Sequence, residues 1–303
     1  MATKIRSLRE IIILEENLLI TMVVFRPNLI SDGLMRKLLK FKIAFVFVAI
    51  TFFTSSCNHY YYAPNSNFTP LMTEKNEVSL NVHGSLGWEH GGGEFQGAYA
   101  LGEHLGVMAS IFSASGEEGT TDSEDSRYYK EEKDSGEGTY YEAGLGYFTA
   151  LNKGNKFRKG VFEVYGGIGR GNVFNSFGEY RSVENSFTKV FVQPSLGYKS
   201  RAFDIAFSGK LSMVNVNLNR NSTDQKIDKS DLDNISFVEG HPGSLVWEPG
   251  FMAQLGWSPI KLKMQLTRSF NLTYPEYPQD NFVFAIGVNA RFNVKKQKPA
   301  GGK

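Results

Sequence analysis

Hydrophobic and polar residues alternate along much of the chain after residue 77. In residues 260–267 every second residue is apolar, and the residues between them are Lys261, Lys263, Gln265 and Thr267. The same period runs through residues 78–89, 190–199, 203–213 and 282–293. Successive side chains of a strand point to opposite faces, so each segment presents one apolar wall and one polar wall. The pattern predicts an all-β fold.

The alternating segments are numerous enough to close a sheet on itself. We expect a single antiparallel up-and-down β-barrel of about ten strands, within a range of about eight to twelve. The barrel domain spans residues 77–294. The predicted strands lie near residues 77–88, 94–101, 105–114, 138–150, 160–173, 187–200, 202–217, 244–257, 260–270 and 281–293.

The connections between the predicted strands alternate in length. Tight turns fall near residues 102–104, 200–202 and 258–259, whereas long polar loops are predicted at residues 115–137, 175–186, 218–243 and 271–280. Short turns on one side and long loops on the other are typical of barrels that span the bacterial outer membrane, with the long loops outside. The alternative is a soluble periplasmic barrel whose apolar wall points inward and binds a small apolar ligand.

A secretory signal precedes the predicted barrel. Residues 35–56 contain a basic start, an apolar run at residues 43–54 and the small residues Ser55 and Ser56. The apolar run is shorter than the roughly 17 residues that a membrane-spanning helix needs. Met35 directly precedes the basic residues, so residues 1–34 are interpreted as an upstream extension outside the mature protein. Residues 57–76 are predicted to be a tether, and residues 295–303 a basic tail.

The end of the signal, Ser55-Ser56-Cys57, resembles a bacterial lipobox. With the tether motif at Tyr60–Asn65, the strand–turn–strand at Gly97–Ser110 and the last strand ending at Phe292, the chain resembles small outer-membrane barrels of the OmpA/OmpX type that carry a lipid anchor. The resemblance implies cleavage between Ser56 and Cys57, acylation of Cys57 and an outer-membrane location. An even strand count returns both termini to the periplasmic side, so the lipid is expected in the inner leaflet. The chain continues beyond Phe292, where such barrels usually end.

The polar walls bring charges of both signs into the predicted lumen. We expect these charges to pair and fill a narrow interior, because an unpaired buried charge is costly. A narrow pore remains an alternative. The predicted lumen-facing residues are His83, Glu142, Glu163, Arg170, Lys199, Asp204, Lys210, Glu248, Lys261, Lys263 and Arg291.

One set of polar residues permits a catalytic hypothesis. His83 and Ser85 share the polar face of one predicted strand, and Glu142 or Glu248 could orient the imidazole, as in a lipid-modifying enzyme. The chain has no G-x-S-x-G motif and no zinc-site spacing, so we expect neither catalysis nor a metal or cofactor. The net charge of +2 predicts no nucleic-acid partner. We expect a monomer with a structural or surface-interaction role, whose protein partners the sequence does not define.

Overall fold

The computed structural model describes residues 61–87, 91–118, 134–151, 158–177, 182–220 and 229–294. The predicted upstream extension, the signal peptide, Ser56, Cys57 and the basic tail lie outside these residues. Within the described part, one short helix, α3 (Lys229–Gly240), accompanies the strands. No helix among the described residues is long and apolar enough to cross a membrane.

The strands follow one another along the chain with the alternating pattern that predicted them. Their bounds are β1 Glu77–Gly87, β2 Gly91–Ala100, β3 Leu105–Glu118, β4 Asp134–Ala150, β5 Arg158–Phe177, β6 Ser182–Ser200, β7 Phe203–Arg220, β8 Gly243–Trp257, β9 Ile260–Arg268, β10 Phe270–Asn271 and β11 Phe282–Asn293.

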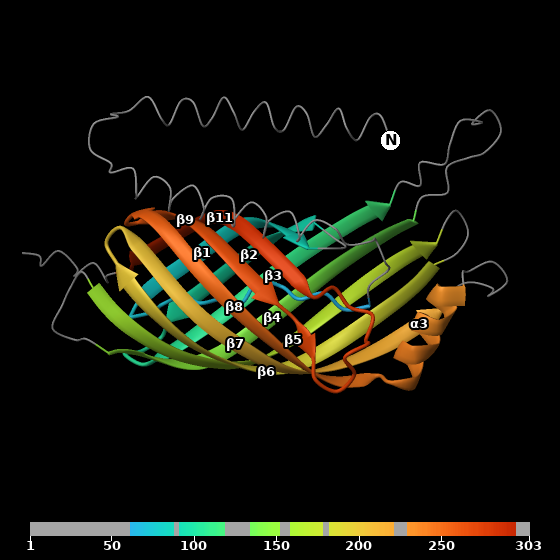
Figure 1. The fold of residues 1–303 in the computed structure, drawn as a ribbon. Helices are drawn as coiled ribbons and strands as arrows, with labels where there is room; N and C mark the ends of the chain where they lie inside the picture. The colour runs from blue at the N-terminus through green and yellow to red at the C-terminus, as the bar shows by residue number, and fades with distance from the viewer. Residues whose placement is uncertain are drawn as a thin grey trace, which may run out of the picture. The chain divides into compact units, whose positions relative to one another are not determined.

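Each strand pairs antiparallel with its neighbours, and the sheet closes on itself. β1 pairs with β11 along its whole length, from Glu77 opposite Asn293 to Gly87 opposite Val283. β8 pairs with β9, and the two-residue β10 continues that edge of β8 after Ser269. β9 and β10 therefore act as one wall strand, and the described chain forms a closed antiparallel barrel of ten strands (Figure 1). This confirms the predicted fold class and strand number.

The two ends of the barrel differ. We call the end with the connections at residues 101–104, 201–202 and 258–259 the turn end, and the opposite end the loop end. At the loop end the strands are longer than predicted: Ser176 pairs with Ser182, and Glu118 pairs with Asp134. The prediction of a long loop at residues 175–186 is therefore wrong, because regular pairing continues almost to the reversal. The predicted loop at residues 218–243 contains α3.

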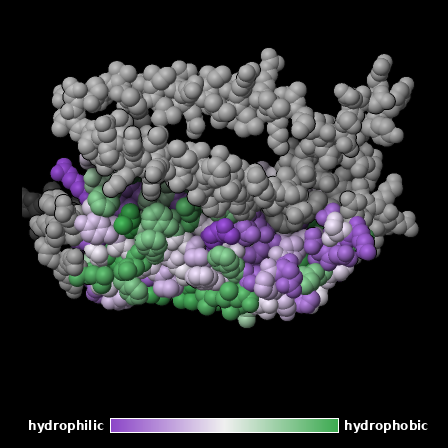
Figure 2. All heavy atoms as spheres, in the orientation of Figure 1, coloured by the Kyte–Doolittle hydropathy of each residue, from purple (hydrophilic) through white to green (hydrophobic). Residues whose placement is uncertain are grey.

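The apolar rows of the strands point away from the barrel interior. Val82, Leu262 and Val288 are 62%, 47% and 47% exposed, whereas their neighbours His83, Lys263 and Asn289 are buried. Figure 2 shows hydrophobic residues over much of the visible wall and hydrophilic residues gathered toward the α3 end. A soluble barrel with an apolar cavity requires the opposite orientation, with Leu262 and Val288 inside. The structure therefore contradicts that alternative.

The barrel interior contains a segment of the same chain. Residues 61–72, which we call the interior segment, are all buried, and in Figure 1 this stretch runs as a thin blue trace behind the front strands. The sequence predicted a tether over residues 57–76. The structure corrects this for residues 61–72, because the wall of the barrel surrounds them on all sides.

Candidate functional site: the interior segment and its wall

The interior segment has neither helical nor strand pairing. Its sequence, YYAPNSNFTPLM, contains Pro64 and Pro70, which lack an N–H group and interrupt regular structure. A buried irregular backbone must find other partners for its remaining N–H and C=O groups. The wall of the barrel supplies them.

Long amide side chains of the wall donate hydrogen bonds to the carbonyls of the segment. The four donors come from three strands, β2, β6 and β9, which fixes the segment from several directions. The pairs are Asn185 Nδ2 to Tyr61 O at 2.8 Å, Gln96 Nε2 to Ser66 O at 2.9 Å, Gln265 Nε2 to Asn67 O at 2.6 Å and Gln193 Nε2 to Phe68 O at 2.7 Å.

Wall carboxylates accept hydrogen bonds from the amides of the segment. Glu163 accepts from Leu71 N at 3.1 Å and from Met72 N at 2.8 Å, and Glu94 accepts from Ser66 N at 3.1 Å. Leu71 has a φ of 53°, a left-handed conformation that is uncommon for a residue with a side chain. The two bonds to Glu163 hold the backbone in that conformation, so this predicted lumen charge binds the chain's own backbone.

A charge cluster lies beside the middle of the segment. Glu142 forms ion pairs with Lys189 and Lys210, the latter at 3.0 Å. Both ammonium groups also donate to Asn65 Oδ1, at 3.3 Å and 3.2 Å. Asn65, an uncharged residue of the segment, therefore accepts hydrogen bonds from the same two lysines that neutralise Glu142.

A second charge cluster lies at the turn end. Asp204 pairs with Lys261 at 2.7 Å and with Arg291 at 3.0 Å, while Lys199 pairs with Glu77 and donates to Leu71 O at 3.3 Å. Lys199, Lys261 and Arg291 also line a cavity of about 600 Å³ at this end.

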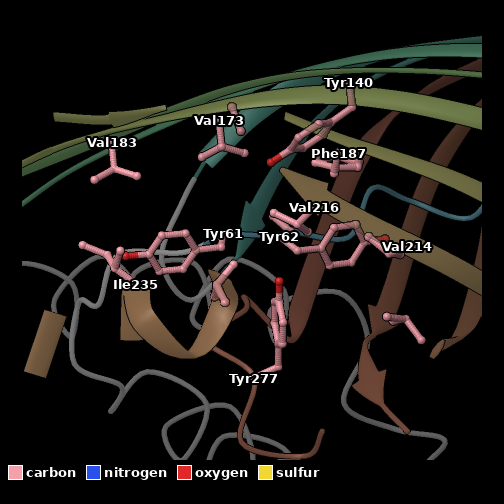
Figure 3. Close-up of a cluster of buried hydrophobic side chains, with 14 of the residues drawn as sticks. Tyr61, Tyr62, Tyr140, Val173, Val183, Phe187, Val214, Val216, Ile235 and Tyr277 are labelled. Atoms are coloured by element: carbon pink, nitrogen blue, oxygen red, sulfur yellow. The ribbon is translucent and has the colours of Figure 1, made fainter. Parts of the chain in front are cut away.

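The loop end is closed by apolar and aromatic packing. Tyr61 and Tyr62 belong to a buried cluster that includes Ile235 and Val238 of α3 and Tyr277 of the β10–β11 connection. Figure 3 shows Tyr61 lying near Ile235, while Tyr62 extends toward Val214. The Tyr62 and Phe187 rings meet edge to face at 5.2 Å between centroids. This cluster holds the amino-terminal end of the interior segment.

His83 does not form the arrangement that the catalytic hypothesis requires. Its Nε2 lies 3.0 Å from Glu94 Oε2 and 3.2 Å from Ser66 Oγ, so the acid and the hydroxyl share one ring nitrogen. A nucleophile–base–acid set needs them on opposite nitrogens. Ser85 lies instead 3.5 Å from Gly92 O, and Glu142 and Glu248 contact other residues. The structure does not bring the proposed set together.

The predicted lumen residues nearly all face the interior. Ten of the eleven contact the interior segment or one another, or line the same inner wall, and the exception is Arg170, which lies exposed on the outward row of β5. Glu94, Gln96 and Lys189 were not singled out from the sequence. All three occupy the polar phase of the alternation, so the period that identified Lys263 applies to them as well. Among the described residues, no group of three His, Cys, Asp or Glu side chains is placed to hold a metal.

The known proteins compared with this chain have low sequence and structural similarity to it. No family model matches the sequence, and no curated protein matches it. Among solved structures, the translocator domain of the autotransporter NalP from Neisseria meningitidis is 10% identical, with a TM-score of 0.34, and the match covers 88% of this chain and all of that one. CdiB from Acinetobacter baumannii is 10% identical, with a TM-score of 0.20, over 71% of this chain and 60% of that one. Both scores are too low to establish a common fold.

Proposed function

We propose that the chain is an outer-membrane β-barrel lipoprotein with a structural or surface-interaction role. The observation that carries the proposal is the orientation of the walls: apolar rows face outward around a polar interior that is already occupied. An outward apolar wall is what lipid requires, and closure pairs the backbone of every strand. The long connections at the loop end then face the outside and meet the environment.

The contents of the interior support a barrel whose lumen is blocked, and they argue against a conducting pore. The segment crosses the lumen, and charged wall residues pair with it or with one another. We propose that the protein acts without catalysis or a cofactor, as a monomer, and without nucleic acid. The OmpA/OmpX-type relationship, the acyl group on Cys57 and cleavage after Ser56 remain part of the proposal, supported by the sequence pattern alone.

Membrane separation followed by gel electrophoresis with and without boiling tests this function. We expect the protein in the outer-membrane fraction, with a mobility shift on boiling, because closed membrane barrels often resist detergent until heated. The Cys57→Ala variant is the matched control. Its retention in membranes with the shift intact supports the spanning barrel, whereas its release into the soluble fraction without a shift contradicts it. Incorporation of labelled palmitate into the natural chain, lost in Cys57→Ala, tests the lipid separately.

A further inference from the structure

The interior segment crosses the barrel from one end to the other in a defined direction. At the loop end, Tyr61 N donates to Pro278 O at 3.2 Å, and Tyr62 O accepts from Asp280 N at 2.9 Å. Pro278 and Asp280 belong to the connection between β10 and β11. At the turn end, Lys199 near the close of β6 donates to Leu71 O and to Thr73 Oγ1. The amino-terminal end of the segment therefore lies at the loop end.

The chain reverses after the segment and enters the wall. Asn76 has a φ of 64°, its N–H donates to Ala100 O at 2.9 Å, and β1 begins at Glu77. β1 then runs back toward the loop end beside β11, which finishes at the turn end with Asn293. Tyr61 and the last residue of β11 thus lie at opposite ends of one barrel.

We propose that the chain threads its own barrel, so that the residues preceding Tyr61 leave on the loop side, opposite the carboxyl-terminal end of β11. The inference rests on the proposed function in one respect, namely that the barrel spans a membrane. It reverses the sequence-based expectation that both termini share the periplasmic side. That expectation counted only wall strands, and the interior segment adds one more crossing.

The short stretch of chain between Cys57 and Tyr61 limits which leaflet a lipid on Cys57 can enter. Cys57 stands four residues before Tyr61, and four extended residues reach at most about 14 Å. The apolar band of a membrane barrel is about 25 Å tall, so a lipid on Cys57 cannot reach the leaflet at the turn end. An acyl group there enters the leaflet on the loop side, beside the exposed loops.

The direction of threading is tested by epitope tags on cells. One tag is inserted between Asn58 and His59, a second between Asp122 and Ser123 in the loop that joins β3 and β4, and a third follows Lys303. Antibody binding is measured on intact cells and after the outer membrane is permeabilised. We expect the first and second tags to be bound on intact cells, and the third only after permeabilisation.

Each outcome decides the proposal. If the first tag behaves like the third and unlike the second, threading is wrong. If the first tag behaves like the second but both need permeabilisation, threading holds and the proposed orientation of the barrel fails. If all three behave alike, the membrane-spanning barrel fails and the inference fails with it. Each tagged chain must keep its boiling-dependent mobility shift. Where a tag prevents folding, labelling of the His59→Cys variant by a membrane-impermeant maleimide on intact cells measures the same accessibility.

Discussion

The hydroxyl of Tyr62 donates a 2.6 Å hydrogen bond to Glu248 Oε1, joining the interior segment to β8. The same hydroxyl accepts from Lys189 Nζ at 3.3 Å, which adds a link to β6. One phenol of the segment therefore bridges two wall strands that are separated by β7. The contact depends on the position of a single residue in a segment that has no regular structure.

Replacing Tyr62 by Phe removes both contacts while keeping the ring in its cluster. We expect a loss of about 1–3 kcal/mol in the free energy of unfolding, because the Glu248 carboxylate stays buried without this donor. Urea unfolding in lipid vesicles measures the loss, with the boiling-dependent mobility shift used to read the folded fraction at each urea concentration. Tyr141→Phe is the control, since Tyr141 is 55% exposed on the outward face. Equal effects of the two substitutions would contradict the role of Tyr62.

Glu142→Gln leaves two buried ammonium groups, those of Lys189 and Lys210, without their carboxylate. We expect a loss of about 3–5 kcal/mol in the free energy of unfolding, because an uncompensated buried charge is costly. Glu184→Gln, at an exposed position of β6, is expected to change stability by less than about 0.5 kcal/mol. Denaturant titration of the two variants side by side checks the difference. A mild effect at Glu142 would mean that water reaches the cluster.

The outward wall is tested by a charge at Val288. Arginine on the lipid-facing side near the bilayer midplane costs about 2–4 kcal/mol, so we expect Val288→Arg to lower the fraction of heat-modifiable protein in the outer membrane. Val288→Leu keeps the apolar character and serves as the control. Normal assembly of Val288→Arg would show that this row does not contact lipid.

An engineered disulfide reports whether the segment occupies the lumen. A Cβ built on Gly250 lies 3.4 Å from the Cβ of Asn67, close to the separation found in disulfides, about 3.5–4.5 Å. In the Cys57→Ala background, Asn67→Cys with Gly250→Cys should crosslink and change mobility on a non-reducing gel. Asn67→Cys with Phe251→Cys is the control, because Phe251 lies on the outward row. Crosslinking of both pairs, or of neither, would count against the interior position.

Gly287 lies where the first and last strands, β1 and β11, pair to close the barrel, a pairing that we call the seam. A Cβ at Gly287 would lie 2.1 Å from Val82 O and 2.3 Å from the Cβ of His83, so β1 and β11 must separate to admit it. We expect Gly287→Ala to lower the temperature at which the folded band disappears on a gel. Gly93→Ala meets no atom within 4 Å and should leave that temperature nearly unchanged. Similar behaviour of the two variants would show that the seam yields easily.

The wall could be predicted from sequence, whereas the contents of the lumen could not. Leu262 and Lys263 differ by one position in a period of two, and that difference alone places one outside and the other inside. The interior segment has no period, and its Asn65, Ser66 and Asn67 have the composition of a linker. What orders it is distant in the chain: Gln265, which binds Asn67 O, lies 198 residues away. Helix α3 was missed for a similar reason, since Ile235 and Val238 become buried only against the aromatic cluster.

The direction of the interior segment also determines how the molecule resists force. A pull on the chain ahead of Tyr61, directed away from the loop end, acts first on the side chains that line the lumen. These contacts, such as Glu163 with Leu71 and Met72, are loaded along the barrel axis before any pair of strands is unzipped. A pull on the carboxyl-terminal end of β11 peels the seam with β1 instead, one hydrogen-bonded pair after another. The two ends of one chain therefore resist force differently. The contacts of the interior segment are loaded together in shear, whereas the backbone hydrogen bonds between β1 and β11 break one after another.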